Sequence, residues 1–129
     1  MNIAVFIKKT TFHKDYGGLE MQNLVLCEGL VSRGHSVTVF SPKLDVMKES
    51  ESANGVEYVF VDCSFRSLGG FAFWDKNNWV NKSVARFEAI NKKKKFDVVL
   101  GQSSAALGII RKKLLNNLFC VFLGSINNQ

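Results

Sequence analysis

Short apolar runs along the chain alternate with longer stretches in which apolar residues recur at helical spacing. Five of the short runs are rich in valine, isoleucine, leucine and phenylalanine, and we predict strands at residues 2–7, 36–40, 55–62, 96–100 and 118–123. Continuous apolar runs of this kind are typical of strands that are buried on both faces of a sheet. The pattern therefore indicates a parallel sheet covered by helices on both sides.

The first helix is predicted between the first two strands, at residues 19–33. It ends at Gly34, because glycine is favoured where a helix closes on a left-handed residue. Apolar residues at helical spacing predict its buried stripe, which consists of Met21, Leu24, Cys27 and Val31 and is widened by Leu26 and Leu30.

Two further helices follow later in the chain. One begins near Asn77, and its buried face is predicted to contain Val80, Val84, Phe87 and Ile90. The other spans residues 105–115. Residues 43–54 are polar and are expected to be mobile, and the aromatic-rich residues 63–75 show no regular period.

The order of these elements predicts an α/β fold. Strands that alternate with helices and are joined by right-handed crossovers build a Rossmann-like parallel sheet with helices on both faces. In order of occurrence along the chain, the five strands are expected to lie side by side as 3-2-1-4-5. Residues 1–129 then form a single Rossmann-like domain, because a chain of this length supports one core.

Ligands of such sheets bind at the carboxyl ends of the strands, near the point where the strand order reverses. Three loops converge there, at residues 8–18, 101–104 and 124–125. Gly17 and Gly18 open the first helix, so their backbone amides can accept a phosphate or diphosphate at the helix N-terminus. The alternative is that the two glycines only make a tight turn.

Other residues of these loops offer weaker signals. His13 lies in the first loop and faces either the cleft or solvent, and Glu20 suits the positive end of the helix dipole. Gln102, Ser103 and Ser104 offer amide and hydroxyl groups for sugar or phosphate contacts, although serine also caps helices. We find no catalytic triad, no paired carboxylates and no metal-binding cluster in the sequence, and expect no cofactor.

The glycine spacing argues against dinucleotide chemistry. A Gly-x-Gly-x-x-Gly motif is missing, and the pair at Gly17 lies well beyond the end of the first strand, so a nicotinamide or flavin domain is disfavoured. No Gly-Lys-Ser/Thr follows the pair either, which excludes a P-loop.

Charge and composition limit the partners. The 17 basic residues outnumber the 11 acidic ones, and nine of the basic residues lie between Lys82 and Lys113. This segment is interpreted either as solvated helix ends or as a surface for anionic lipid. Nucleic acid is not expected, because the aromatic residues are not interleaved with the basic ones.

The same composition bears on localisation. Cys27, Cys63 and Cys120 lack metal-ligand spacing and are interpreted as free thiols of a reducing cytoplasm. No apolar window is long enough to span a membrane, and the N-terminus does not resemble a signal peptide. A cytoplasmic protein is therefore predicted, with peripheral contact to the inner face of the membrane if the basic segment binds lipid.

Four motifs, taken in order, resemble one family. They are Asn-Ile-Ala-Val-Phe from Asn2, Tyr-Gly-Gly-Leu-Glu from Tyr16, Ser-Arg-Gly-His-Ser-Val-Thr-Val-Phe from Ser32 and Phe-Asp-Val-Val-Leu from Phe96. Together they resemble the N-terminal, acceptor-side domain of family 4 glycosyltransferases of the GT-B type, which are retaining enzymes that use nucleotide-sugar donors.

This resemblance implies a reaction in the cleft between two Rossmann-like halves. It assigns Gly17 and Gly18 to the donor diphosphate. It assigns the acceptor side to the ends of the fourth and fifth strands, at Gln102, Ser103, Ser104, Gly124 and Ser125. The acceptor it implies is a sugar or a lipid-linked molecule.

The chain also departs from the family pattern. A histidine that often precedes a glycine after the fifth strand is replaced by Leu123. The C-terminal donor-binding domain is absent, and the sheet is expected to stop after its fifth strand. We therefore expect the chain alone to be inactive. The alternative is a non-catalytic module that binds partners or self-associates through its exposed edge strand.

Overall fold

The computed structural model describes residues 1–8, 10–12, 17–43, 48–62, 64–66, 72–74, 76–102 and 119–123. Within them the chain forms a six-stranded sheet, a two-stranded sheet and two helices, α1 (Gly18–Ser32) and α2 (Lys76–Lys93). The strands are β1 (Asn2–Phe6), β2 (Ser36–Pro42), β3 (Ser50–Ala53), β4 (Val56–Val61), β5 (Ser64–Arg66), β6 (Ala72–Trp74), β7 (Val98–Gln102) and β8 (Phe119–Leu123). The helix predicted at residues 105–115 lies outside the described residues.

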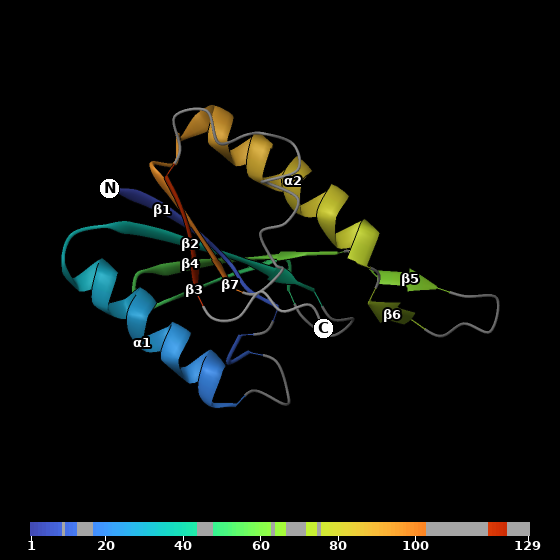
Figure 1. Ribbon diagram of the computed structural model, residues 1–129, viewed down its shortest axis with the longest axis horizontal. Coiled ribbons are helices and arrows are strands. Elements are labelled where there is room, and N and C mark those ends of the chain that lie inside the picture. Colours follow the sequence, from blue (N-terminus) through green and yellow to red (C-terminus); the bar gives the residue numbers. More distant parts are fainter. Residues whose placement is uncertain are drawn as a thin grey trace.

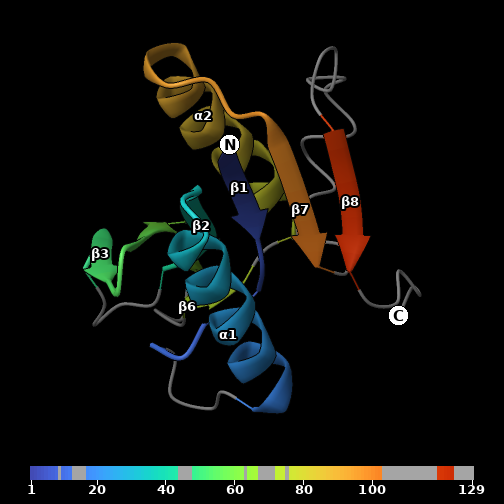
Figure 2. The ribbon, with the colours of Figure 1, turned by 90° about the vertical axis from the view of Figure 1, so that its left-hand side faces the viewer.

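The large sheet has the order β3-β4-β2-β1-β7-β8. All neighbouring strands are parallel except β3 and β4. The five predicted strands thus lie in the predicted order, and the α/β Rossmann-like architecture is confirmed. Figure 2 shows β1, β7 and β8 pointing toward the same end of the molecule, the end at which α1 begins. β1 occupies the centre, and each of its residues is buried.

The antiparallel strand β3 corrects one prediction. Residues 43–54 were expected to be polar and mobile, but Ser50–Ala53 pairs with β4, and Ala53 lies opposite Val56. The turn between the two strands consists of Asn54 and Gly55, with φ of 51° and 84°. These left-handed angles are those of a tight hairpin turn, which Asn-Gly favours. The hairpin pairing, rather than an apolar pattern, makes this segment a strand.

The aromatic-rich segment 63–75 contains a second short hairpin. β5 and β6 pair antiparallel, with Phe65 opposite Phe73. Figure 1 shows this hairpin projecting from the sheet beside the first turn of α2. The sequence showed no period here, because three-residue strands are too short to display one.

The two long helices cover opposite faces of the sheet, as predicted (Figure 1). In α1 the buried residues are Asn23 and Cys27, with Leu30 and Val31 packed partly against the core. The predicted stripe is therefore wrong at Met21 and Leu26, which are 42% and 37% exposed. Leu26 is turned by about 100° from Cys27, and Met21 by about 200° from Asn23, so both point away from the sheet.

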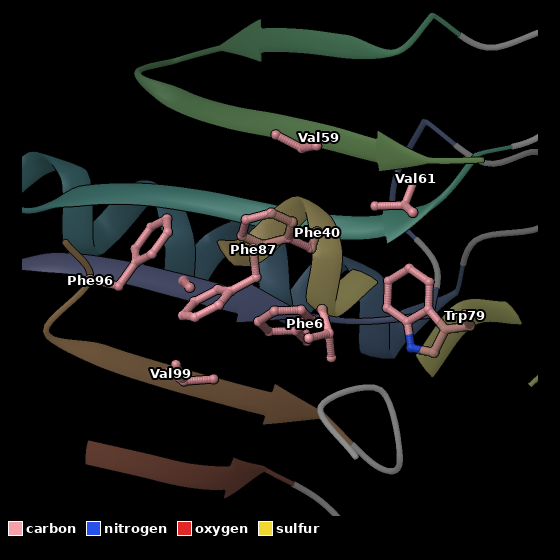
Figure 3. Close-up of a cluster of buried hydrophobic side chains, with 10 residues drawn as sticks. Phe6, Phe40, Val59, Val61, Trp79, Phe87, Phe96 and Val99 are labelled. Atoms are coloured by element: carbon pink, nitrogen blue, oxygen red, sulfur yellow. The ribbon is translucent and has the colours of Figure 1, made fainter. Parts of the chain in front are cut away.

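Helix α2 packs on a cluster of aromatic side chains. Phe6 and Phe40 stack with ring centres 4.8 Å apart, and Phe87 stacks on Phe96 at 5.2 Å. Figure 3 shows these rings side by side between the helix and the strands, with Trp79 at the far end of the cluster. Val84 and Phe87 are buried as predicted, and Trp79, which is outside the predicted buried face, is also in the core at 1% exposed.

Candidate functional site

The carboxyl ends of the parallel strands lie along one edge of the sheet. Phe6 of β1 lies opposite Gly101 of β7, and Gln102 of β7 lies opposite Leu123 of β8. Chain order runs in one direction from β1 through β2 and in the other through β7, so the reversal lies between β1 and β7. This is the position at which doubly wound sheets bind ligands.

The structure brings together the stems of the predicted loops. Gln102 is the last residue of β7, and its backbone pairs with that of Leu123, so the loops that follow β7 and β8 start as neighbours. His13, Ser103, Ser104, Gly124 and Ser125 lie outside the described residues. Their assignment to the cleft therefore remains a prediction.

Gly17 and Gly18 lie at the start of α1, as predicted. Gly17 is the N-cap in an extended conformation, with φ −132° and ψ −157°, and Gly18 is the first helical residue. A Cβ atom built on Gly18 meets no described atom within 4 Å, and one on Gly17 meets only the Glu20 carboxylate at 3.8 Å. Neither glycine has a positive φ. The described fold therefore requires glycine at neither position, which argues against the tight-turn alternative.

Glu20 interacts with the N-cap residue of the same helix. Its Oε1 atom accepts a hydrogen bond of 2.7 Å from the amide of Gly17. This satisfies one of the amides that a helix N-terminus leaves without an intrahelical partner. The amides of Gly18, Leu19 and Glu20 have no carbonyl one turn earlier in the helix, so they remain directed toward the open end.

The segment after β1 is held against the α1 side of the sheet. Thr10 is 2% exposed, and its hydroxyl accepts a hydrogen bond of 3.1 Å from the amide of Phe12. The Phe12 ring contacts Tyr58 and Phe60 edge-on, at 5.0 and 5.8 Å. These contacts direct the chain across the carboxyl end of β4 before it reaches the glycine pair.

Two ionisable groups beneath α1, Cys27 and Tyr58, have raised pKa values and stay protonated at neutral pH. Burial raises the pKa of the Cys27 thiol to about 12, although a hydrogen bond with Asn23 opposes the shift. Burial also raises the pKa of Tyr58 to about 12. Cys27 is a free thiol, as predicted, and its depth in the core makes it a structural residue rather than a nucleophile. Cys63 lies outside the described residues.

The described part of the chain contains no group of three or more His, Cys, Asp or Glu side chains placed to hold a metal ion. None of its helices is long and apolar enough to cross a lipid bilayer.

The sequence profile of Glycosyltransferase Family 4 matches residues 16–122. The chain belongs to Glycosyltransferase Family 4. The matched region includes the glycine pair, both helices and the parallel strands β2, β4 and β7, and it begins after β1. No curated protein matches the chain's sequence with significance.

Solved structures show the same fold. Sucrose-phosphate synthase from Thermosynechococcus elongatus superimposes with a TM-score of 0.73 at 14% identity, over 94% of this chain and 32% of that one. The catalytic domain of starch synthase IV from Arabidopsis thaliana, bound to ADP and acarbose, gives 0.63 at 16% identity, over 94% and 33%. This family 4 chain thus spans about a third of the length of these proteins. At such low identity the likeness establishes the GT-B type of Rossmann-like fold.

Proposed function

We propose that this chain is the acceptor-side domain of a retaining glycosyltransferase, which transfers a sugar from a nucleotide-sugar donor to a sugar or lipid-linked acceptor. Residues 1–129 form one Rossmann-like domain of such an enzyme, and a second domain supplies the donor-binding half. Family membership supports sugar transfer as the general activity. The observation that carries the proposal is the open start of α1 beside the reversal point of the sheet.

The start of α1 suits the donor diphosphate. Among the described residues, only the Glu20 carboxylate lies within 4 Å of a Cβ atom built on Gly17 or Gly18, and the amides that follow point toward an approaching ligand. The positive end of the helix dipole stabilises negative charge that develops on the leaving diphosphate. The Glu20 carboxylate accepts a hydrogen bond from the Gly17 amide, so a phosphate that binds this amide has to displace the carboxylate.

The acceptor side is assigned to the loops that start at the ends of β7 and β8. Gln102, Ser103 and Ser104 follow β7, Gly124 and Ser125 follow β8, and His13 lies in the loop after β1. These groups would hold the acceptor hydroxyl close to the donor, so that catalysis depends on orientation and electrostatic stabilisation. No metal or other cofactor is invoked.

The diphosphate site is tested by titrating the ¹⁵N-labelled protein with UDP and, in parallel, with uridine. UDP is expected to shift the amide signals of Gly18 and Leu19, and uridine is not, because it lacks phosphate. The Gly18→Ala variant is expected to weaken the UDP response at least tenfold, since its methyl group lies in the path of the ligand.

Gly29→Ala is the matched control. Gly29 lies in the same helix, and a Cβ atom there also meets no described atom within 4 Å. Its replacement is expected to stabilise the protein by roughly 0.5–1 kcal/mol, because alanine favours the helix, and to leave the UDP response unchanged. A UDP response that is equal in wild type and Gly18→Ala contradicts the assigned site.

The need for a second domain is tested by incubating the chain with a panel of nucleotide sugars and acceptors. No sugar transfer is expected from residues 1–129, because the proposal assigns donor binding to a second domain. Turnover by the purified chain would overturn this part of the proposal.

A second candidate is a non-catalytic module that self-associates. It is favoured by β8, which pairs with β7 and has no second neighbour within the described part of the sheet. A strand with an open edge can pair with another copy. Light scattering across a range of protein concentrations tests this candidate, and a monomer at every concentration contradicts it.

The basic segment supports a further proposal, peripheral contact with an anionic membrane on the cytoplasmic side. Lys92, Lys93, Lys94 and Lys95 are all exposed at the end of α2. Such clusters attract acidic lipid headgroups. Co-sedimentation with vesicles is expected to increase with their content of phosphatidylserine, and sedimentation that is indifferent to anionic lipid would remove the proposal.

A further inference from the structure

A cleft of about 370 Å³ lies on the α2 side of the sheet, at the carboxyl end of β4. Its lining comprises Glu49, Phe60, Val61, Asp62, Lys82, Ala85 and Arg86. It lies away from Gly17 and Gly18, which open the helix on the opposite face of the sheet. In volume it falls at the small end of the range for ligand sites, which suits a monosaccharide-sized group.

One wall of the cleft carries two positive charges. Lys82 and Arg86 are four residues apart in α2, so they project from the same side of the helix. The neighbouring residues Ser83, Val84 and Phe87 are buried and hold the helix against the sheet. Neither basic side chain forms an ion pair with a described carboxylate. Within the described part of the chain, both charges are therefore available to an anion.

The opposite wall carries two negative charges on a well-held backbone. The amide of Phe60 donates to the carbonyl of Glu49 over 2.9 Å, which extends the pairing of β3 with β4. The amide of Lys43 donates to the carbonyl of Val61 over 2.8 Å, which holds the end of β4 beside β2. Glu49 and Asp62 are thus placed across the cleft from the helix.

This distribution of charge fits a ligand that carries both a phosphate group and hydroxyl groups. Arginine and lysine bind phosphate through charge-assisted hydrogen bonds, and the planar arginine group can do so with two parallel bonds. Carboxylates accept hydrogen bonds and have no donors of their own when ionised, so the opposite wall suits hydroxyl groups. A simple phosphate site would gain nothing from two nearby carboxylates, because they repel the anion.

We propose that this cleft binds a phosphorylated sugar, with its phosphate on Lys82 and Arg86 and its hydroxyl groups on Glu49 and Asp62. Val61 and Ala85 supply an apolar surface for the carbon skeleton between the two walls. The residues of the cleft support binding alone, and a role for the bound sugar phosphate as acceptor rests on the proposed function.

The cleft is placed to serve the reaction edge of the sheet. β4 is separated from β1 by β2 alone, and adjacent strands are about 4.8 Å apart. The end of β4 thus lies roughly 10 Å from the end of β1. A ligand held at the cleft therefore lies two strands away from the point where the strand order reverses.

Binding is tested by isothermal titration of the intact protein with glucose 6-phosphate, glucose and inorganic phosphate. Glucose 6-phosphate is expected to bind at least tenfold more tightly than either partial ligand, because it alone engages both walls. Lys82→Gln and Arg86→Gln are each expected to weaken its binding about tenfold, the effect of losing one charge-assisted hydrogen bond. Both side chains are exposed, so the variants are expected to fold.

Two control variants match the test variants in chemistry. Lys93→Gln removes a positive charge from the same helix outside the cleft, and Glu57→Gln removes a carboxylate from β4 outside it. Both are expected to bind glucose 6-phosphate within twofold of the wild type. Glu49→Gln is expected to weaken the binding of glucose 6-phosphate, while the binding of inorganic phosphate stays unchanged or becomes slightly tighter.

Three results would overturn the proposal. One is the absence of glucose 6-phosphate binding. Another is an equal loss of glucose 6-phosphate affinity in Lys93→Gln and Arg86→Gln, which would show that the ligand responds to the positive charge of the helix as a whole and not to the cleft. The third is glucose 6-phosphate binding no tighter than inorganic phosphate, which would remove the role of the carboxylate wall.

The same titrations separate this proposal from the proposed function. Gly18→Ala is expected to leave glucose 6-phosphate binding unchanged, and Arg86→Gln is expected to leave the UDP response at α1 unchanged. If UDP fails to shift the α1 amides while glucose 6-phosphate binds as described, the cleft stands and the diphosphate site fails. If UDP shifts the α1 amides while glucose 6-phosphate does not bind, the proposal for the cleft fails and the diphosphate site stands.

Discussion

The two faces of the sheet are covered in different ways. On the α2 face the helix contributes Trp79, Val84 and Phe87 to a cluster that also contains Phe6 and Phe40 of the strands. On the α1 face the helix contributes one fully buried apolar residue, Cys27, with Leu30 and Val31 only partly buried. The α2 face therefore buries far more aromatic surface.

The outward sides of the helices differ as well. α1 exposes Leu19, Val25 and Leu26, at 51%, 67% and 37%, whereas the outward residues of α2 include Lys82, Arg86 and Glu88. A helix that is apolar on more than one side is not oriented by its own pattern. The contrast teaches that α2 is positioned by its pattern, while α1 is positioned by its connections to β1 and β2 and by the turn at its end.

The strongest test of this comparison is Phe87→Ala. It is expected to lower the free energy of unfolding by about 3–5 kcal/mol, because the cavity opens among rings packed at 5.2 to 6.1 Å. Urea denaturation followed by circular dichroism measures the change. Cys27→Ala, on the other face, is expected to cost about 1 kcal/mol. Equal losses in the two variants would remove the distinction between the faces.

The next test concerns the turn against which α1 packs. Gly55 has a φ of 84°, and a Cβ atom there would lie 2.6 Å from Cγ1 of Val31. Gly55→Ala is expected to cost about 2–3 kcal/mol, because it combines a left-handed backbone with this clash. Gly34→Ala is the control, since Gly34 also has a positive φ, of 94°, but no described atom within 4 Å of a Cβ.

Gly34→Ala is expected to cost about 1–2 kcal/mol, the backbone contribution alone. Adding Val31→Ala to Gly55→Ala is expected to recover part of the loss, which denaturation of the double variant measures. A Gly55→Ala cost no greater than that of Gly34→Ala would show that α1 does not depend on this close approach.

The pH dependence of stability tests the α1 face alone. The pKa values of Cys27 and Tyr58 are raised to about 12 from ordinary values of 9.0 and 10.0. Above pH 9 the unfolded chain therefore loses protons that the folded chain keeps, so stability falls as pH rises toward 12. Each group contributes a slope of up to about 1.4 kcal/mol per pH unit.

Denaturation at several values between pH 8 and 11 measures this slope. Cys27→Ala is expected to reduce it, because one of the two buried groups is removed. An unchanged slope in that variant would show that the Cys27 thiol titrates normally in the folded protein.

The smallest effect is expected on the exposed side of α1. Val25→Ala should change the free energy of unfolding by no more than about 0.5 kcal/mol, with a gain expected because alanine favours helices over valine. Thermal denaturation measures it. A loss of several kcal/mol would show that Val25 is covered by another part of the protein or by a second copy.

Much of the fold was predictable because parallel strands have strong local signals. The five apolar runs, their order and the start of α2 near Asn77 followed from periodicity and from the handedness of crossovers. β3 was missed because Ser50–Ala53 has a composition that disfavours strands, and its pairing depends on the turn. The Asn54–Gly55 pair is the signal that predicts such a turn, and it was present in the sequence.

The site was predictable only in part. The position of Gly17 and Gly18 at the start of a helix followed from the chain, as did the closeness of the loops after β7 and β8. Lys82 and Arg86 were recognised only as members of a basic segment. Glu49 and Asp62 were not singled out, because they lie 20 or more positions from Lys82 and Arg86 in the chain and no local pattern joins them to these residues.

The sequence by itself determined the five parallel strands, the helices α1 and α2 and the order in which the parallel strands lie. Those properties depend on local propensity, apolar period and short connections, all of which act between near neighbours in the chain. Only the tertiary structure decided that Asn23, rather than Met21 and Leu26, faces the sheet beside the predicted Cys27. It also decided that the charges of Glu49, Asp62, Lys82 and Arg86 line one cleft. These depend on how helices and strands dock, which is set by contacts between residues that are distant in the chain.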